Sequence, residues 1–198
     1  MSLANRLNTI YGTYEEHFNG IRMRYNPSIH HRRSNRLPNF DYSKSGLYFL
    51  TLCCQDRLPL FGDISEGKML FNPAGYWASQ CWMEIPNHNP AAILHEFVIM
   101  PNHIHGIIEL DNSKIPEQNR KVHSFQGMIP KSLASIVKGY KIGVTKWFRK
   151  NSDIEKVWQR NYYEHIIRDQ KEFETISAYI RNNPKKWNED RFYTRRNG

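Results

Sequence analysis

The sequence of 198 residues is short of the features that mark several protein classes. Only three cysteines are present, Cys53, Cys54 and Cys81. Their odd number, without the spacing of a metal-binding motif, argues against a disulfide framework. No apolar run approaches the roughly 18–20 residues that span a bilayer. The first twenty residues also lack the apolar stretch of a secretion signal, so we expect a cytoplasmic protein with no membrane partner.

Acidic residues are scarce as well. The 28 Lys and Arg outnumber the 19 Asp and Glu, which gives a net charge of +9 and a sequence pI of about 9.5. The basic residues gather in three stretches, 22–44, 131–150 and 185–196. Such patches release counterions when they neutralise phosphates, so a polyanion is the expected partner, nucleic acid before a membrane surface. With 39% hydrophobic and 13% aromatic residues, the chain has too much apolar material for a disordered protein.

Composition also divides the chain. Residues 1–40 are rich in Asn, Arg, His and Pro, and Pro27 and Pro38 interrupt any helix, so we expect a basic N-terminal arm. Residues 41–187 form the predicted folded domain. Residues 188–198 are the predicted basic C-terminal tail.

Local patterns predict the elements of this domain. Short runs rich in strand formers predict strands at 47–54, 68–71, 93–99, 103–110 and 163–167. Apolar residues at helical spacing predict helices at 73–85, 130–149 and 170–183. Pro86 and Pro184 are expected to end the first and last of these helices. The order predicts an α+β fold, in which helices back an antiparallel sheet, and the ferredoxin-like split βαβ arrangement is the nearest named architecture.

Two histidines in the fourth predicted strand are the first candidate site residues. Side chains at i and i+2 of a strand point to the same face, so His103 and His105 project together while Ile104 packs on the other face. Two neutral imidazoles on one face can bind a metal ion. A pair of this kind also occurs by chance on surface strands, so the pattern alone leaves both interpretations open.

Tyr179 and Asn183 form a second candidate pair, four residues apart on the last predicted helix. Residues at i and i+4 lie on one side of a helix, so the hydroxyl and the amide can face one site. They could equally be a half-buried aromatic residue and a helix C-cap. Because a residue before proline disfavours helical angles, we expect Asn183 in a frayed last turn before Pro184.

Three blocks of sequence resemble one known family. The block at 98–108, VIMPNHIHGII, resembles the HUH motif (His-hydrophobe-His) of single-tyrosine transposases. The blocks WQRNYYEH at 158–165 and YIRNNP at 179–184 resemble the C-terminal half of the same proteins. The segment RRSNRLP at 32–38, leading into YFLT at 48–51, resembles the opening of the REP-associated tyrosine transposases.

The resemblance implies a function for each candidate residue. His103, His105 and Asn183 would bind a divalent metal ion, Mg²⁺ or Mn²⁺, and Tyr179 would be the nucleophile. The implied reaction is cleavage of single-stranded DNA near hairpins, which leaves a 5′-phosphotyrosine and a free 3′-hydroxyl. The later reversal of this step would rejoin the strand, as a transposase requires.

Other residues are expected to contact the DNA. The resemblance places DNA contacts at Arg32, Arg33 and Arg36, in the block that opens the family pattern. Lys138 and Lys141 belong to the second basic stretch and are expected on the exposed side of its helix. The partner would be single-stranded or hairpin DNA, bound by a monomer or a homodimer.

Several alternatives stay open at this point. Tyr162 and Tyr163 are chemically capable rival nucleophiles, and His165 could support the metal site or be a packed strand residue. A DNA-binding protein without catalysis, descended from a transposase, would share the basic stretches. A rolling-circle-type nickase would share the HUH motif, although the chain is short for one.

Overall fold

The computed structural model describes residues 45–111, 113 and 132–193 of the chain. The predicted arm at 1–40, with Arg32, Arg33 and Arg36, therefore lies outside the described residues.

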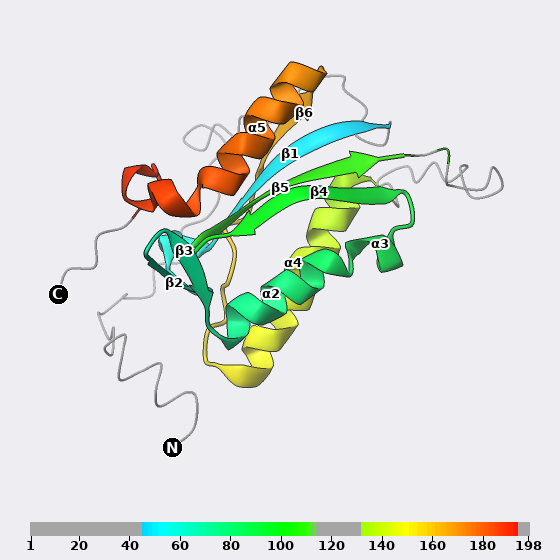
Figure 1. Ribbon diagram of the computed structural model, residues 1–198. Coiled ribbons are helices and arrows are strands. Elements are labelled where there is room, and N and C mark those ends of the chain that lie inside the picture. Colours follow the sequence, from blue (N-terminus) through cyan, green and yellow to red (C-terminus); the bar gives the residue numbers. More distant parts are fainter. Residues whose placement is uncertain (1–44, 112, 114–131, 194–198) are drawn as a thin grey trace, which may run out of the picture.

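A four-stranded antiparallel sheet forms the centre of the described part, in the order β4-β5-β1-β6 (Figure 1). The strands are β1 (Gly46–Cys53), β4 (Ala92–Ile99), β5 (His103–Leu110) and β6 (Tyr163–Ile167). A separate hairpin joins β2 (Gly62–Ser65) and β3 (Lys68–Phe71). The sequence patterns predicted every one of these strands except β2. That strand is short, and its single large apolar residue stands between polar ones.

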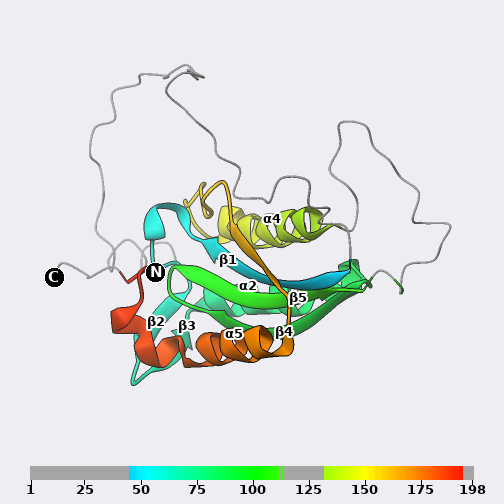
Figure 2. The same ribbon diagram turned by 90° about the horizontal axis from the view of Figure 1, so that it is seen from above.

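The helices lie on both faces of the sheet. α2 (Pro73–Met83) and α4 (Leu133–Asn151) cover one face, and α5 (Gln170–Asn182) lies on the other, as Figures 1 and 2 show. The remaining helices are short: η1 (Gln55–Arg57), α3 (Ile85–His88) and η4 (Pro184–Glu189). Along the chain α2 lies between β1 and β4, and in the sheet β5 lies between these two strands. This is the split βαβ arrangement. The predicted α+β class and architecture are confirmed.

Helix ends follow the local sequence with one exception. Asn72 caps α2 by accepting a hydrogen bond from the Gly75 amide, and Asp169 caps α5 through the Glu172 amide. The predicted helix over 73–85 is wrong at its end, because α2 stops at Met83. Pro86 does not end it but lies in the first turn of α3, where its missing amide hydrogen is tolerated.

Alternating side chains of the strands build two apolar layers. Under α2 and α4, Tyr48, Leu50 and Leu52 pack with Ile104 and Ile108 in the main core. Under α5, a smaller cluster is formed by the buried residues Phe49, Ile107, Ile167 and Ile180. His103 and His105 alternate with Ile104 along β5, so they face the α5 side of the sheet.

Candidate metal and nucleophile site

His103 and His105 lie side by side on β5, and both side chains are buried. Their ring centroids are 4.5 Å apart. The common face predicted from the period of the strand is therefore what the structure shows.

Each imidazole is oriented by a partner on its Nδ1 atom. His103 Nδ1 donates to Asn102 Oδ1 at 2.9 Å. The Asn102 amide group donates to the carbonyl oxygens of Arg57 and Phe192, so its oxygen is the remaining acceptor. His105 Nδ1 hydrogen-bonds with Thr51 Oγ1 at 2.9 Å. Partners on Nδ1 of this kind orient metal-binding histidines so that Nε2 can coordinate.

Burial keeps both imidazoles neutral. Burial, assisted by His105 and nearby arginines, holds the His103 pKa well below its usual value of 6.5. Burial and the Arg191 charge lower the pKa of His105 to about 3. His103 Nε2 is buried and has no hydrogen-bond partner among the described residues. A neutral imidazole with an unpaired buried nitrogen is suited to binding a metal ion.

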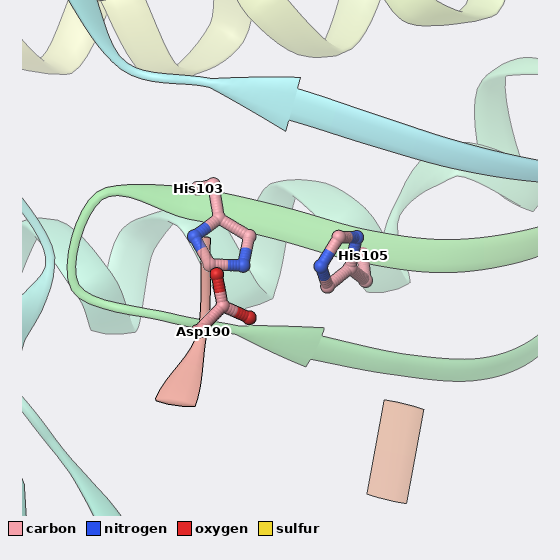
Figure 3. Close-up of side chains that lie close together, drawn as sticks. All are labelled: His103, His105 and Asp190. Atoms are coloured by element: carbon pink, nitrogen blue, oxygen red, sulfur yellow. The ribbon is translucent and has the colours of Figure 1, made fainter. Parts of the chain in front are cut away.

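Asp190 joins the two histidines. One ligand atom from each of His103, His105 and Asp190 lies within 4.8 Å of the others, and Figure 3 shows the carboxylate directed toward the two rings. Sequence reasoning missed this residue, because it lies in the stretch expected to be a basic tail. The sequence offered one indication of Asp190, which is that it is an acidic residue in a basic stretch.

The segment after η4 covers the histidines. The Phe192 ring lies over His103, with centroids 4.6 Å apart, and the Phe192 carbonyl accepts the Asn102 amide at 2.8 Å. Arg57 donates to the Arg191 carbonyl at 3.2 Å. The described part of the predicted tail, residues 188–193, therefore differs from a solvated tail, because it packs on the site.

Tyr179 reaches the same site from α5. Its hydroxyl lies 3.1 Å from His105 Nε2, and its ring packs against the rings of His105 and Phe49. The side chain is 44% exposed, so the hydroxyl lies between the buried histidines and solvent. Partial burial and then the Asp190 charge raise the pKa of Tyr179 above its usual value of 10.

Asn183 lies one turn after Tyr179, as the spacing predicted. It keeps helical angles (φ −56°, ψ −44°), so the expected frayed turn before Pro184 is wrong. The 3-10 helix η4 continues the chain past the proline, and this fixes the backbone of Asn183. The Asn183 amide donates to Asp190 at 3.2 Å, while its Oδ1 is buried and has no partner among the described residues.

The Glu96 carboxylate of β4 bonds to two residues of α5 that flank Tyr179. Glu96 accepts a hydrogen bond from Ser177 at 3.3 Å and forms an ion pair with Arg181 at 2.5 Å. The register of β4 against β5 shifts between Leu94 and Phe97, and Glu96 lies inside this irregularity. β-bulges commonly redirect a side chain next to a functional site.

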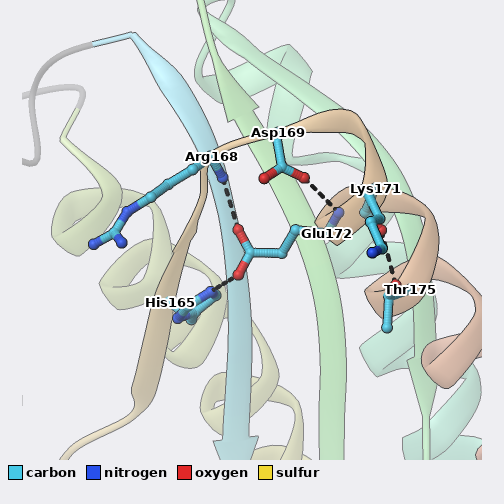
Figure 4. A network of polar contacts seen from close by, with 6 residues as sticks. All are labelled: His165, Arg168, Asp169, Lys171, Glu172 and Thr175. Atoms are coloured by element: carbon cyan, nitrogen blue, oxygen red, sulfur yellow. Dashed lines mark hydrogen bonds and ion pairs between the residues drawn. The ribbon is translucent and has the colours of Figure 1, made fainter.

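His165 forms an ion pair with the first turn of α5. Its Nε2 lies 2.6 Å from Glu172 Oε1, and the other carboxylate oxygen accepts the Arg168 amide (Figure 4). These bonds join β6 to the first turn of α5 and lower the pKa of Glu172. His165 therefore holds the start of the helix that carries Tyr179.

The other predicted residues lie away from the histidines. Lys138 and Lys141 lie on α4, on the opposite face of the sheet from α5. The Lys141 ammonium donates to the carbonyl oxygens of Gln159 and Asn161, so two of its hydrogens are used within the protein. Tyr163 contacts Phe49 edge-on at 6.3 Å, whereas Tyr162 lines a cleft beside α4.

Comparison with known proteins gives three informative matches. An uncharacterised Haemophilus influenzae protein is 47% identical over 175 residues, which cover 86% of this chain and 97% of that protein. A second Haemophilus influenzae protein, named a REP-associated tyrosine transposase, is 29% identical over 150 residues, 74% of each chain. The structure of a REP-associated tyrosine transposase bound to a REP hairpin shares the fold, with a TM-score of 0.53 and 19% identity. That match covers 77% of this chain and 74% of the other.

No family model matches the sequence. Among the residues that the structure describes, no helix is both long enough and apolar enough to cross a membrane.

Proposed function

We propose that the chain is a REP-associated tyrosine transposase, like its 29% identical relative of that name, and that it cleaves and rejoins single-stranded DNA in a metal-dependent reaction. The observation that carries the proposal is the 3.1 Å contact between the Tyr179 hydroxyl and His105 Nε2. It joins a half-exposed candidate nucleophile to a pair of buried, neutral imidazoles.

His103, His105 and Asn183 are the proposed metal ligands. The unpartnered, buried atoms His103 Nε2 and Asn183 Oδ1 fit this role, because buried polar atoms normally have a partner. Two imidazoles and an amide alone are a modest ligand set for Mg²⁺ or Mn²⁺, which prefer oxygen. Asp190 supplies the missing carboxylate, and we include it as a further ligand. When bound there, the divalent ion would polarise the scissile phosphate.

Tyr179 is the proposed nucleophile. Its phenol oxygen forms a bond to phosphorus and gives up its proton to solvent, while the bond from phosphorus to the 3′-oxygen breaks and that oxygen takes up a proton from solvent. A 5′-phosphotyrosine and a free 3′-hydroxyl result. Because the phosphodiester is exchanged for another ester, attack by a 3′-hydroxyl can reverse the step and rejoin the strand without a separate energy source.

Hairpin DNA is the proposed partner. The structurally similar transposase is bound to a REP hairpin, and the net charge of +9 suits a polyanion. We therefore propose hairpin-containing repeats as the substrate, with cleavage in the single strand beside the hairpin. The contacts proposed for Arg32, Arg33 and Arg36 belong to this interaction.

The covalent intermediate provides the direct test. Wild-type protein incubated with Mn²⁺ and a labelled hairpin oligonucleotide with single-stranded flanks should form an adduct that is stable in denaturing gels. Tyr179→Phe should form none, because it lacks only the attacking oxygen. Tyr163→Phe is the matched control, since it removes the hydroxyl of another half-exposed tyrosine, and it should still form the adduct.

Two results would contradict the proposal. An adduct that persists in Tyr179→Phe and disappears in Tyr163→Phe or Tyr162→Phe would reject Tyr179 as the nucleophile. Tight binding of the hairpin without an adduct in any variant would favour the non-catalytic DNA-binding protein.

Thr51→Val tests the orientation of His105. The change keeps the shape of the side chain but removes the hydroxyl that hydrogen-bonds with Nδ1. We expect Mn²⁺ affinity, measured by isothermal titration calorimetry, to fall about 10- to 100-fold, as for other groups that orient metal ligands. Thr175→Val is the control, because among the described residues that hydroxyl bonds only the Lys171 carbonyl of its own helix. Equal affinities in the two variants would show that Thr51 does not orient the ligand.

A further inference from the structure

A basic cleft lies beside α4, on the face of the sheet opposite the histidines. The cleft has a volume of about 390 Å³, within the range of ligand-binding clefts. We call it the α4 cleft; its basic and aromatic lining residues are Lys138, Lys141, Lys146, Arg149, Arg160 and Tyr162. None of the described residues that line it is acidic, so its charge is of one sign.

Lys141 connects α4 to the segment 159–161 on the other side of the α4 cleft. Its ammonium donates to the carbonyls of Gln159 and Asn161 at 2.9 and 3.1 Å and lies 5.8 Å from the Trp158 ring centroid. Burial lowers the pKa of Lys141 to about 8. These bonds hold the segment that carries Arg160 against the helix. Lys138, Lys146 and Arg149 then remain as the exposed cations of α4 that line the cleft.

Two consecutive tyrosines connect the α4 cleft with the nucleophile. Tyr162 lines the cleft, whereas Tyr163, the first residue of β6, contacts Phe49 on the other face. The Phe49 ring in turn packs against His105 and Tyr179, with centroids 5.4 and 6.2 Å away. Among the residues that the structure describes, β6 is an edge strand with no further strand of the sheet beyond it.

We propose that a single DNA strand follows this path. Its phosphates bind in the α4 cleft, the chain passes over the β6 edge, and a base stacks on Tyr163 before the scissile phosphate reaches Tyr179. The inference rests on the proposed function and adds the route of the substrate. Basic clefts with aromatic rings bind single strands in this way, with little dependence on sequence.

The cleft lysines provide the first test. Lys138→Gln/Lys146→Gln should weaken binding of a hairpin oligonucleotide with a long single-stranded flank, and the slope of log affinity against log salt should fall by about 1.4, since each phosphate contact on a single strand contributes about 0.7. Lys68→Gln/Lys150→Gln is the matched control: it removes the same charge from exposed positions outside the cleft. The control should keep the wild-type slope.

Tyr163 provides the second test. Tyr163→Ala should weaken binding of the same oligonucleotide roughly 5- to 150-fold, the range for loss of one stacked base, whereas Tyr163→Phe should retain affinity because it keeps the ring. Equal losses in the cleft and control doubles, or an unchanged affinity in Tyr163→Ala, would overturn the route. Binding is measured without cleavage, so a wild type that binds through the cleft but forms no adduct would refute the proposed function and leave the route supported.

Discussion

Replacing His103 with alanine is expected to lower the rate of covalent adduct formation by about 10³-fold or more. The imidazole is buried, its Nδ1 is fixed by Asn102, and its unpartnered Nε2 is the atom proposed to bind the ion. A bound metal ion contributes several kcal/mol to stabilising the charge of a phosphoryl transition state, and each 1.36 kcal/mol changes the rate about tenfold. The rate is measured from the labelled adduct at saturating Mn²⁺ and DNA.

The control for this prediction is His95→Gln. His95 is a partly buried histidine of β4 that hydrogen-bonds with Glu109, and an amide can keep that bond. Its adduct should form at close to the wild-type rate. Urea unfolding of His103→Ala in the absence of metal distinguishes loss of the ion from loss of the fold. A folded His103→Ala protein with full activity would exclude His103 as a ligand.

The second large effect is expected at Gly106, the residue after His105. A Cβ atom there would lie 2.3 Å from Cζ2 and 2.8 Å from Cη2 of Trp82. Trp82 is fully buried between Phe97 and Tyr140, so its ring has no free space into which to move. We expect Gly106→Ala to lower the free energy of unfolding by about 3 kcal/mol, the upper part of the usual range for an overpacked core.

Gly139→Ala is the matched control for Gly106→Ala. Gly139 lies inside α4, and nothing lies within 4 Å of a Cβ atom added there. Alanine should therefore stabilise the helix by about 0.5–1 kcal/mol. Urea unfolding midpoints should move in opposite directions for the two variants. A Gly106→Ala protein as stable as the wild type would show that α2 can move away from β5.

Much of the fold followed from local sequence patterns. The strand at 163–167 matches β6 in both of its bounds, and Asp169 begins α5 as its cap. These features depend on the period of the side chains and on capping, which involve residues a few positions apart. Two predictions that depended on a proline were wrong: the end of the helix at Pro86 and the frayed turn before Pro184. In both places the proline lies in the first turn of a short following helix, where it is tolerated.

The sequence alone determined that His103 and His105 share one face, and that Tyr179 and Asn183 share another, since both follow from the geometry of a single strand or helix. Only the tertiary structure brought these pairs together and added Asp190, because the contact depends on how the chain after α5 folds back over β5. It also decided the environment of the basic residues: Lys141 binds backbone carbonyls, whereas Lys138 and Lys146 line an exposed cleft. Composition gives the number of charges, but the packing of distant segments decides which charges a partner can reach.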